Sequence, residues 1–414
     1  MPWPGLLALF SAAFTAVMTE LLPAGLLPQL GGALGVSQAQ VGFLVTGYAV
    51  ASFLAAIPLT ALLRGLARRP VLVGALTGFA FCNGVTALSS SYAVTFGARV
   101  LAGVMGGILW AMLVGYAARM VPAERRGRAI AIVSAGITVA LCAGIPAGAA
   151  LASAFGWRAA FGGLSVVAVV LVGWALWKVP NFPGEAVSAR VSLRRVAVIP
   201  GIRTVLSVTV LVLVGHQAMY TYVAAFVELS GVVRTSVVLL VFGVGTVAGI
   251  WVVGAVIDRF LRVSLVVVLA VVAGAMTVLG VFGGSAGPPG GSAGFVEESA
   301  GLLGGSPGLL GGGSAGVLLL GAVALWGAAF GGVPTLLQTA LVDASGAENA
   351  DVATSMQTTV YNAGIAAGSL VGGVVLEGAG AGALPWTSLP LVAVALLIVA
   401  TARRHAFPAR RAAA

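Results

Sequence analysis

The stretch that decides the fold is residues 5–30, GLLALFSAAFTAVMTELLPAGLLPQL, which contains a single charged side chain, Glu20. A helix that crosses the hydrocarbon core of a bilayer needs roughly 20 consecutive apolar residues, so this stretch is long enough to span a membrane. It is too long for the core of a signal peptide and no typical cleavage site follows it, so we expect it to remain in the mature protein.

The rest of the chain has the same character. Of its 414 residues, 60% are hydrophobic and 8% are charged, and the mean hydropathy is +1.10. A soluble domain carries about 25% charged residues because its surface faces water. The composition therefore excludes a soluble enzyme, a nucleic-acid-binding protein and a disordered protein as descriptions of the whole chain. It predicts an all-α polytopic membrane protein.

Hydropathy divides the chain into twelve predicted membrane spans. Twelve helices of this length use about 240 to 260 residues, which leaves short loops and a tail. The predicted spans are 5–30, 41–63, 71–90, 93–118, 129–153, 159–177, 204–228, 235–257, 263–282, 314–340, 353–376 and 388–402.

The 21 Lys and Arg side chains are distributed unevenly over the loops between these spans. Only Arg99, Arg158 and Arg234 fall outside the cytoplasmic side if the N-terminus is cytoplasmic. The others are Arg64, Arg68, Arg69, Arg119, Arg125, Arg126, Arg128, Lys178, Arg190, Arg194, Arg195, Arg203, Arg259, Arg262, Arg403, Arg404, Arg410 and Arg411. Short loops rich in Lys and Arg stay in the cytoplasm. The pattern predicts a multi-pass membrane protein with both termini cytoplasmic, and it assigns the net charge of +10 to topology and anionic lipid rather than to nucleic acid.

The polar stretch 178–203 separates six predicted spans from six others. We expect an N-terminal bundle over 1–177, a cytoplasmic linker over 178–203 and a C-terminal bundle over 204–414 that ends in a basic tail, 403–414. The loops after the second and eighth spans are similar when Arg64 is aligned with Asp258, an offset of 194 residues. Weak internal symmetry of this kind is typical of transporters built from two six-helix repeats.

Two sequence patterns that resemble enzyme motifs are better explained by composition and packing. Residues 283–316 are rich in Gly, Ser and Pro, which is typical of a flexible external linker, and their three Gly-x-Ser-x-Gly matches lack the strand and helix of a hydrolase elbow. The Gly243-x-Gly245-x-x-Ala248 pattern lies within an apolar span, where small residues favour close helix packing. Cys82 and Cys142 form neither a disulfide framework nor a metal-ligand pattern, and we expect no metal, no cofactor and no enzyme activity.

Ionisable side chains inside a bilayer are expensive, so each one needs a physical reason. Glu20 is the only acidic residue that lies well within a predicted span. At 1.5 Å per residue it is about 23 Å from the inner end of its span, and Arg99 is roughly 9 Å from the outer end of its own. We expect the two to face a common cavity and to interact, with Glu20 exchanging a proton as its access to water changes. The alternatives are a static hydrogen bond for Glu20 and a structural clamp for Arg99.

A second group of polar and aromatic side chains provides candidates for a substrate cavity. His216 titrates near neutral pH when unperturbed, and tyrosines offer flat, amphipathic contact area. Packed, hydrogen-bonded side chains are the alternative for each of them. The candidates are Met18, Trp110, His216, Tyr220, Tyr222, Gln338, Gln357, Tyr361 and Asn362.

The predicted fifth span carries small residues in steps of four. Gly136, Ala140 and Gly144 share one helix face, and the sequence continues Ile-Pro146-Ala-Gly148. Small residues on one face allow a partner helix to approach closely, and Pro146 bends the helix. Plain packing explains the first three residues, whereas the added proline is more typical of a pliant contact between moving parts.

The motifs that carry a family resemblance are spread over the chain. They are Met18-Thr-Glu20-Leu-Leu-Pro23-Ala-Gly25-Leu-Leu-Pro28, Arg99-Val-Leu-Ala-Gly103, Gly144-Ile-Pro146-Ala-Gly148, Gly156-Trp157-Arg158, Tyr220-Thr-Tyr222 and Gly254-x3-Asp258-Arg259. Together they resemble the major facilitator superfamily, and within it the twelve-span drug:proton antiporters of the arabinose-efflux and chloramphenicol-resistance permease type. The resemblance covers the chain except for 283–316.

The resemblance implies two six-helix bundles around a central cavity and export of a small molecule in exchange for protons by alternating access. Glu20 and Arg99 would couple the proton, and a monomer in the lipid bilayer would suffice. The residues implied in the conformational change are Gly136, Gly144, Pro146, Gly148, Asp258 and Arg259. The alternatives are a facilitator or proton symporter of the same fold and, in a different class, a membrane receptor or assembly factor.

One loop departs from the pattern of the superfamily. The loop after the second span has Thr60 where the superfamily usually has Gly, and Arg64 where it usually has Asp. The resemblance therefore implies an altered charge lock in the N-terminal half, while Asp258 and Arg259 keep the C-terminal version.

Overall fold

Every element of the described chain is a helix. The computed structural model describes residues 1–63, 65–122, 125–184, 198–199, 201–231, 234–283, 313–345, 350–402 and 406–407. Among these residues, twelve helical segments are long and apolar enough to span a membrane, so the twelve predicted spans and the all-α class are confirmed. The chain divides into two compact units, Met1–Val191 and Ser192–Ala414, and the division falls within 178–203.

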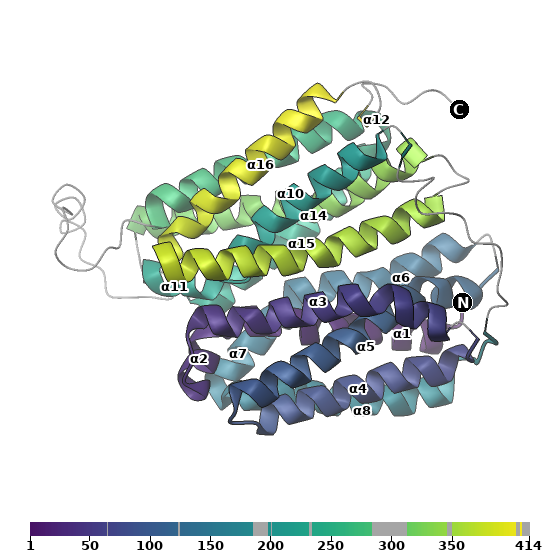
Figure 1. Cartoon of the computed structure of the whole chain (residues 1–414). Coiled ribbons are helices and arrows are strands. Elements are labelled where there is room, and N and C mark those ends of the chain that lie inside the picture. Colours follow the sequence, from purple (N-terminus) through teal and green to yellow (C-terminus); the bar gives the residue numbers. More distant parts are fainter. Residues whose placement is uncertain are drawn as a thin grey trace. The chain divides into compact units, whose positions relative to one another are not determined.

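Both units contain six spans (Figure 1). The first contains α1 (Trp3–Leu21), the short helix Leu22–Gly25, α2 (Leu27–Leu34), α3 (Gln38–Leu63), α4 (Arg68–Leu88), α5 (Tyr92–Arg119), α6 (Arg126–Val139), the π-helical turn Ala140–Gly144, α7 (Ile145–Phe155) and α8 (Trp157–Lys178). The second contains α10 (Ile202–Tyr220), α11 (Val223–Ser230), α12 (Thr235–Gly283), α14 (Gly313–Ser345), α15 (Ala350–Ala379), the 3-10 turn Ala381–Ala383 and α16 (Leu384–Thr401).

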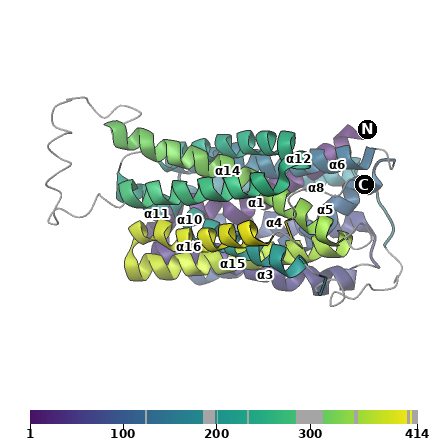
Figure 2. The ribbon, with the colours of Figure 1, turned by 90° about the horizontal axis from the view of Figure 1, so that it is seen from above.

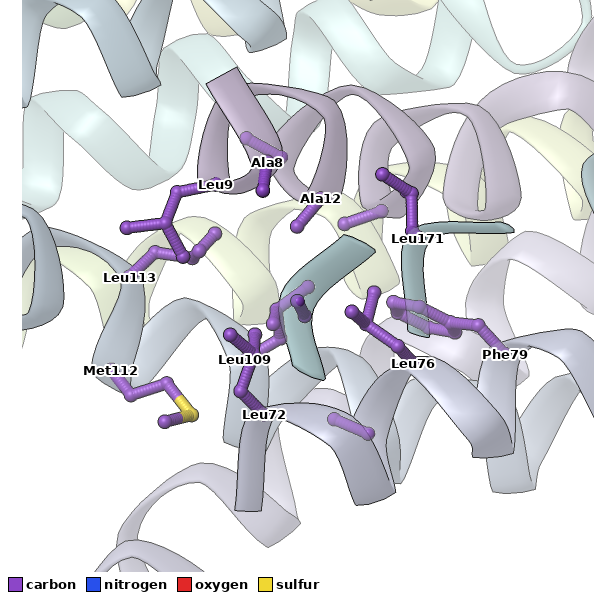
Figure 3. Close-up of a cluster of buried hydrophobic side chains, with 14 of the residues drawn as sticks. Ala8, Leu9, Ala12, Leu72, Leu76, Phe79, Leu109, Met112, Leu113 and Leu171 are labelled. Carbon is purple, nitrogen blue, oxygen red and sulfur yellow. The ribbon is translucent and has the colours of Figure 1, made fainter. Parts of the chain in front are cut away.

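The core of the first unit forms where α1 meets α4, α5 and α8. Leu9 of α1, Leu76 and Phe79 of α4, Leu109 of α5 and Leu171 of α8 belong to one buried apolar cluster (Figure 3). Helices suit this environment because each satisfies its own backbone hydrogen bonds, which lipid cannot do. The cluster holds α1 in the middle of its unit.

The first and seventh predicted spans are not single helices, which corrects the sequence prediction. Each is interrupted near its end, at Leu26 (φ −126°) in the first unit and at Tyr222 (φ −110°) in the second. Each interruption is followed by an eight-residue helix that ends at a left-handed glycine, Gly35 or Gly231, both with φ 65°. Glycine adopts this conformation without steric cost. Both pairs are 196 residues apart, which extends the predicted internal symmetry to the backbone.

The fifth span also changes its helical form, just before Pro146. The backbone widens into a π-helical turn over Ala140–Gly144 before α7 begins at Ile145. Pro146 has no N–H and its ring crowds the carbonyl four residues earlier. A single π-helical turn relieves that conflict while the helix continues, so the residues of the motif produce a wide turn.

Small residues bring helix backbones into contact in both units. In the second unit, α12 and α14 run side by side (Figure 2), and added Cβ atoms at Gly245 and Gly249 would collide with the Ala324 and Ala328 carbonyls. The packing interpretation of the 243–248 pattern is therefore confirmed.

The same kind of contact is repeated at equivalent positions of the two units. A Cβ at Gly103 would meet the Tyr48 carbonyl, and one at Gly327 would meet that of Phe242. Tyr48 and Phe242 are 194 residues apart, the offset found in the sequence.

Several predicted features fall outside the described residues. These are Arg64, most of the loop 283–316, most of the linker and most of the basic tail, as well as the side chains of Asp258 and Arg259. The backbone of the ninth span is described, and it joins the eighth with one departure from helical geometry, at Phe260 (φ −132°).

Candidate functional site

Arg99 is the centre of a buried polar cluster in the first unit. Its side chain is 1% exposed. Its Nη2 donates hydrogen bonds to the backbone carbonyls of Thr19 and, at 3.3 Å, of Glu20. The guanidinium carbon lies 5.2 Å from the ring centroid of Tyr48 and 6.0 Å from that of Phe161. Carbonyl dipoles and aromatic faces therefore compensate for the water that this charge has lost.

The local sequence explains why Arg99 binds at this point of α1. In a continuous helix the carbonyl of Thr19 would accept a hydrogen bond from the N–H of residue 23, but Pro23 has none. Arg99 supplies the missing donor. Pro23 thus accounts both for the end of α1 and for the free carbonyl that Arg99 binds.

Glu20 lies at this end of α1 and is 6% exposed. Its Oε1 is buried and has no hydrogen-bond partner among the described residues. Asn83 of α4 donates from Nδ2 to the hydroxyl of Thr19 at 2.9 Å, which fixes the residue next to Glu20. The structure thus brings Glu20 and Arg99 together as the sequence predicts, but the guanidinium binds the helix backbone and leaves a carboxylate oxygen available.

The small-residue face of the fifth span (α6 to α7) packs against α1 directly beside this cluster. A Cβ at Gly136 would collide with the backbone of Phe10, and one at Gly144 would lie 2.5 Å from the sulfur of Met18. Met18 is 4% exposed, so in this structure its side chain fills a helix–helix contact. The face follows α1 as far as Leu22, which a Cβ at Gly148 would meet.

A second cluster, in the second unit, surrounds His216 of α10 with aromatic rings. The imidazole stacks on Phe330 with ring centroids 3.3 Å apart and an interplanar angle of 4°. It also contacts Tyr220 and Phe242. The Nε1–H of Trp326 donates to Nδ1 of His216 at 3.2 Å. Protonated Nδ1 has no lone pair to accept this bond, so the contact requires the neutral ring and places the remaining proton on Nε2.

Tyr222 occupies the interruption between α10 and α11 and is fully buried. Its hydroxyl donates to the carbonyl of Ser369 at 2.8 Å, and a neighbouring chain of hydrogen bonds links Gln217, Thr221 and the hydroxyl of Ser369. These bonds join α10 and α11 to α15.

Sequence analysis missed the face of α15 that receives these groups. Cβ atoms at Gly364, Gly368 and Gly372 would meet Leu213, Gln217 and Tyr222, respectively. The missed signal is a Gly-x3-Gly-x3-Gly repeat, which favours close packing just as the repeat in the fifth span (α6 to α7) does.

The remaining candidates for the substrate cavity differ in their solvent exposure and in their hydrogen bonds. Gln338 is exposed and Trp110 is half-buried against the core of the first unit. On α15, Asn362 donates to the carbonyl of Thr358, whereas Gln357 Nε2 and the hydroxyl of Tyr361 are buried without hydrogen-bond partners among the described residues. Within those residues no three His, Cys, Asp or Glu side chains gather as metal ligands would.

The hydroxyls of Tyr222 and Tyr361 give a matched pair of substitutions. Tyr222→Phe is expected to lower the free energy of unfolding by about 1 kcal/mol, because the Ser369 carbonyl loses a donor. Tyr361→Phe is expected to be neutral or stabilising, because that hydroxyl has no partner in the described protein. Denaturant unfolding in detergent measures both. A rise in the transport KM of Tyr361→Phe alone would identify its hydroxyl as a substrate contact; an equal loss of stability in both would contradict the assignment.

Twelve spans in two six-span units, with a buried cluster of ionisable side chains, define a polytopic membrane transporter. The chain belongs to the Major Facilitator Superfamily, whose family model matches residues 9–296. The expected resemblance is therefore confirmed at the level of the family.

Curated relatives make the comparison more specific. The chain is 33% identical to a chloramphenicol resistance protein of Streptomyces lividans, covering 96% of this chain and 95% of that one. It is 29% identical to a chloramphenicol efflux pump of Mycobacterium tuberculosis, covering 91% and 88%. It is also 30% identical to a Pseudomonas aeruginosa protein named transcription regulatory protein OpdE, over 67% of this chain and 72% of that one.

A solved structure supports the fold independently of sequence. A bacterial homologue of the human lysosomal transporter Spinster, in its inward-facing and unoccupied conformation, matches with a TM-score of 0.72. The identity is 14%, and the match covers 100% of this chain and 99% of that one.

Proposed function

We propose that this protein exports a small neutral or singly charged compound across the bacterial inner membrane in exchange for protons, with Glu20 as the coupling carboxylate. The observation that carries the proposal is the buried Glu20 carboxylate, whose Oε1 has no partner in the described protein although a guanidinium lies beside its backbone. The names of two relatives make chloramphenicol the first compound to test.

The physical basis of the coupling is the balance between burial and charge at Glu20. Loss of water disfavours a charged carboxylate, whereas a nearby cation favours it. Movement that changes the access of water, or the position of Arg99, changes which form is stable. Alternating access then exposes the protonated form on one side of the membrane and the ionised form on the other, with both termini cytoplasmic and a monomer as the working unit.

A neutral substrate makes the exchange electrogenic. Each proton that enters carries one positive charge, and a membrane potential contributes about 2.3 kcal/mol per proton and 100 mV. The potential alone is therefore expected to drive export when no pH gradient is present. An imposed potassium diffusion potential in proteoliposomes tests this part of the proposal.

The experiment that tests the proposal measures protons released when chloramphenicol is added to the purified protein in weakly buffered detergent. We expect release from the wild type and none from Glu20→Gln, which retains the shape of the side chain but cannot ionise. Glu377→Gln is the matched control, because this acid is exposed on α15, and it should behave like the wild type.

Binding and transport measured in parallel separate the alternatives. Chloramphenicol transport without a proton signal, or a Glu20→Gln protein that releases protons normally, contradicts the proposal and favours a facilitator or another coupling site. Absence of transport for a broad panel of compounds favours a non-transporting role.

A further inference from the structure

Four helices of the first unit each carry a residue of the Arg99 cluster, or of its immediate neighbours, that has a buried, unpartnered polar atom. The atoms are Glu20 Oε1 on α1, the Tyr48 hydroxyl on α3, Asn83 Oδ1 on α4 and Arg99 Nε on α5, none of which has a hydrogen-bond partner among the described residues. Tyr48 and Asn83 are 0% exposed. A buried polar atom without a partner costs about 1–3 kcal/mol, so a group of four requires an explanation.

Hydrogen bonds and a cation–π contact connect these four side chains through the end of α1. Asn83 binds the hydroxyl of Thr19, and Arg99 binds the carbonyls of Thr19 and Glu20. The ring of Tyr48 lies 5.2 Å from the guanidinium of Arg99. The four atoms therefore belong to residues that are connected directly or through at most two intermediate residues.

The chemistry of the four atoms fits water better than an ion. Asn83 Oδ1 and ionised Glu20 accept hydrogen bonds, Arg99 Nε–H donates one, and the Tyr48 hydroxyl can do either. Water offers two donors and two acceptors, and buried waters typically make about three hydrogen bonds to groups of this kind. The guanidinium disfavours a cation, and the carboxylate and amide oxygens disfavour an anion.

We propose that this cluster is an internal hydration site that holds one or two water molecules against the Glu20 carboxyl, with Tyr48 and Asn83 as the positioning residues. The water stabilises ionised Glu20 by donating to it. On deprotonation, the proton passes from the carboxyl oxygen to the water oxygen and then to bulk solvent, and it returns by the reverse steps. Only this proton-transfer role rests on the proposed function; the hydration of the cluster does not.

Three ionisable side chains interact electrostatically with Arg99. They are Glu20, Tyr48 and the buried thiol of Cys82 on α4. Glu20 is the only carboxylate among them, so it is the group whose infrared band reports the site directly.

Infrared difference spectroscopy of the whole protein in detergent, titrated without substrate, tests the hydration site. The carbonyl stretch of protonated Glu20 is the band that Glu20→Gln removes. Tyr48→Phe and Asn83→Leu are expected to shift it to higher frequency, because the carboxyl loses hydrogen bonds from water. Exchange into H₂¹⁸O is expected to perturb the neighbouring water bands in the wild type but not in these two variants. Thr19→Val separates the two roles of Asn83, because it removes the direct bond but leaves Oδ1 in place.

Transport provides the second readout. The rate of chloramphenicol-driven proton release is expected to fall about 10- to 100-fold in Tyr48→Phe and Asn83→Leu, as for a lost hydrogen bond to a charged group. Tyr116→Phe is the control, because its hydroxyl instead donates to the carbonyl of Pro180 at 2.6 Å, and its band and rate should match the wild type.

The outcomes are distinct. An unshifted Glu20 band in both Tyr48→Phe and Asn83→Leu overturns the hydration site, and so does an equal shift in Thr19→Val and Asn83→Leu, which would assign Asn83 to the bond with Thr19 alone. If the band shifts as expected but chloramphenicol releases no protons, the hydration site stands and the proposed function fails.

Discussion

Arg99→Ala is expected to abolish proton-coupled transport and to lower the free energy of unfolding by about 3–5 kcal/mol, as when one partner of a buried charge interaction is removed. The substitution leaves the Thr19 carbonyl without the donor that replaces the missing N–H of Pro23, and it opens a cavity between Tyr48 and Phe161. It also removes the cation that offsets the burial of ionised Glu20. Thermal unfolding and substrate-driven proton release, measured on the same preparation, test both effects.

A further variant and a control separate the structural role of Arg99 from the effect of its charge. Arg99→Lys retains the positive charge but lacks the planar fork of donors, so we expect partial recovery of proton release with little recovery of stability. Arg158→Ala is the control, because Arg158 also donates to a helix-end carbonyl, that of Ser89, and stacks on an aromatic ring, but at an exposed position. If Arg99→Ala is no more damaging than Arg158→Ala, the central position of Arg99 in the site is wrong.

Most of the fold could be predicted from the sequence because the bilayer imposes simple rules. A span must be long, apolar and helical, and the Lys and Arg residues that flank it indicate which loops are cytoplasmic. Every predicted span therefore corresponds to a helical segment of the structure, although the first and the seventh are each divided into two helices. The interruptions at Leu26 and Tyr222 were not predicted, because hydropathy is insensitive to the backbone. The first of them had a local signal in Pro23, whereas the second has no proline.

Only the ionisable residues of the candidate site could be predicted from the sequence. Glu20 and Arg99 were predicted to meet because ionisable groups within spans are rare and expensive. Asn83 and Tyr48 were not predicted, because single polar residues in apolar helices give no periodic signal, and their roles depend on which helices pack together. The aromatic surroundings of His216 likewise depend on packing between α10, α12 and α14.

The second large effect is expected at Gly136, on the face of α6 that packs against α1. A Cβ at this position would collide with the backbone carbonyl of Phe10, which cannot rotate away. Gly136→Ala is therefore expected to lower the free energy of unfolding by about 3 kcal/mol, the upper part of the range for overpacking, and to reduce transport at least tenfold. At Gly148 the obstructing atoms are the side-chain ends of Leu22 and Met18, at 2.7 and 3.2 Å, so Gly148→Ala is expected to cost about 1 kcal/mol.

The contrast between these two glycines tests whether α1 and α6 are in fixed backbone contact. Gly163→Ala on α8 is the control, since a Cβ there meets nothing within 4 Å, and the better helix propensity of alanine should stabilise the protein by about 0.5–1 kcal/mol. Denaturant unfolding of the three variants gives the order directly. Equal costs at Gly136 and Gly148 would mean that α1 moves away from α6 as easily as a side chain rotates. The small-residue face would then be a sliding contact during transport and not the rigid support of the cluster around Arg99.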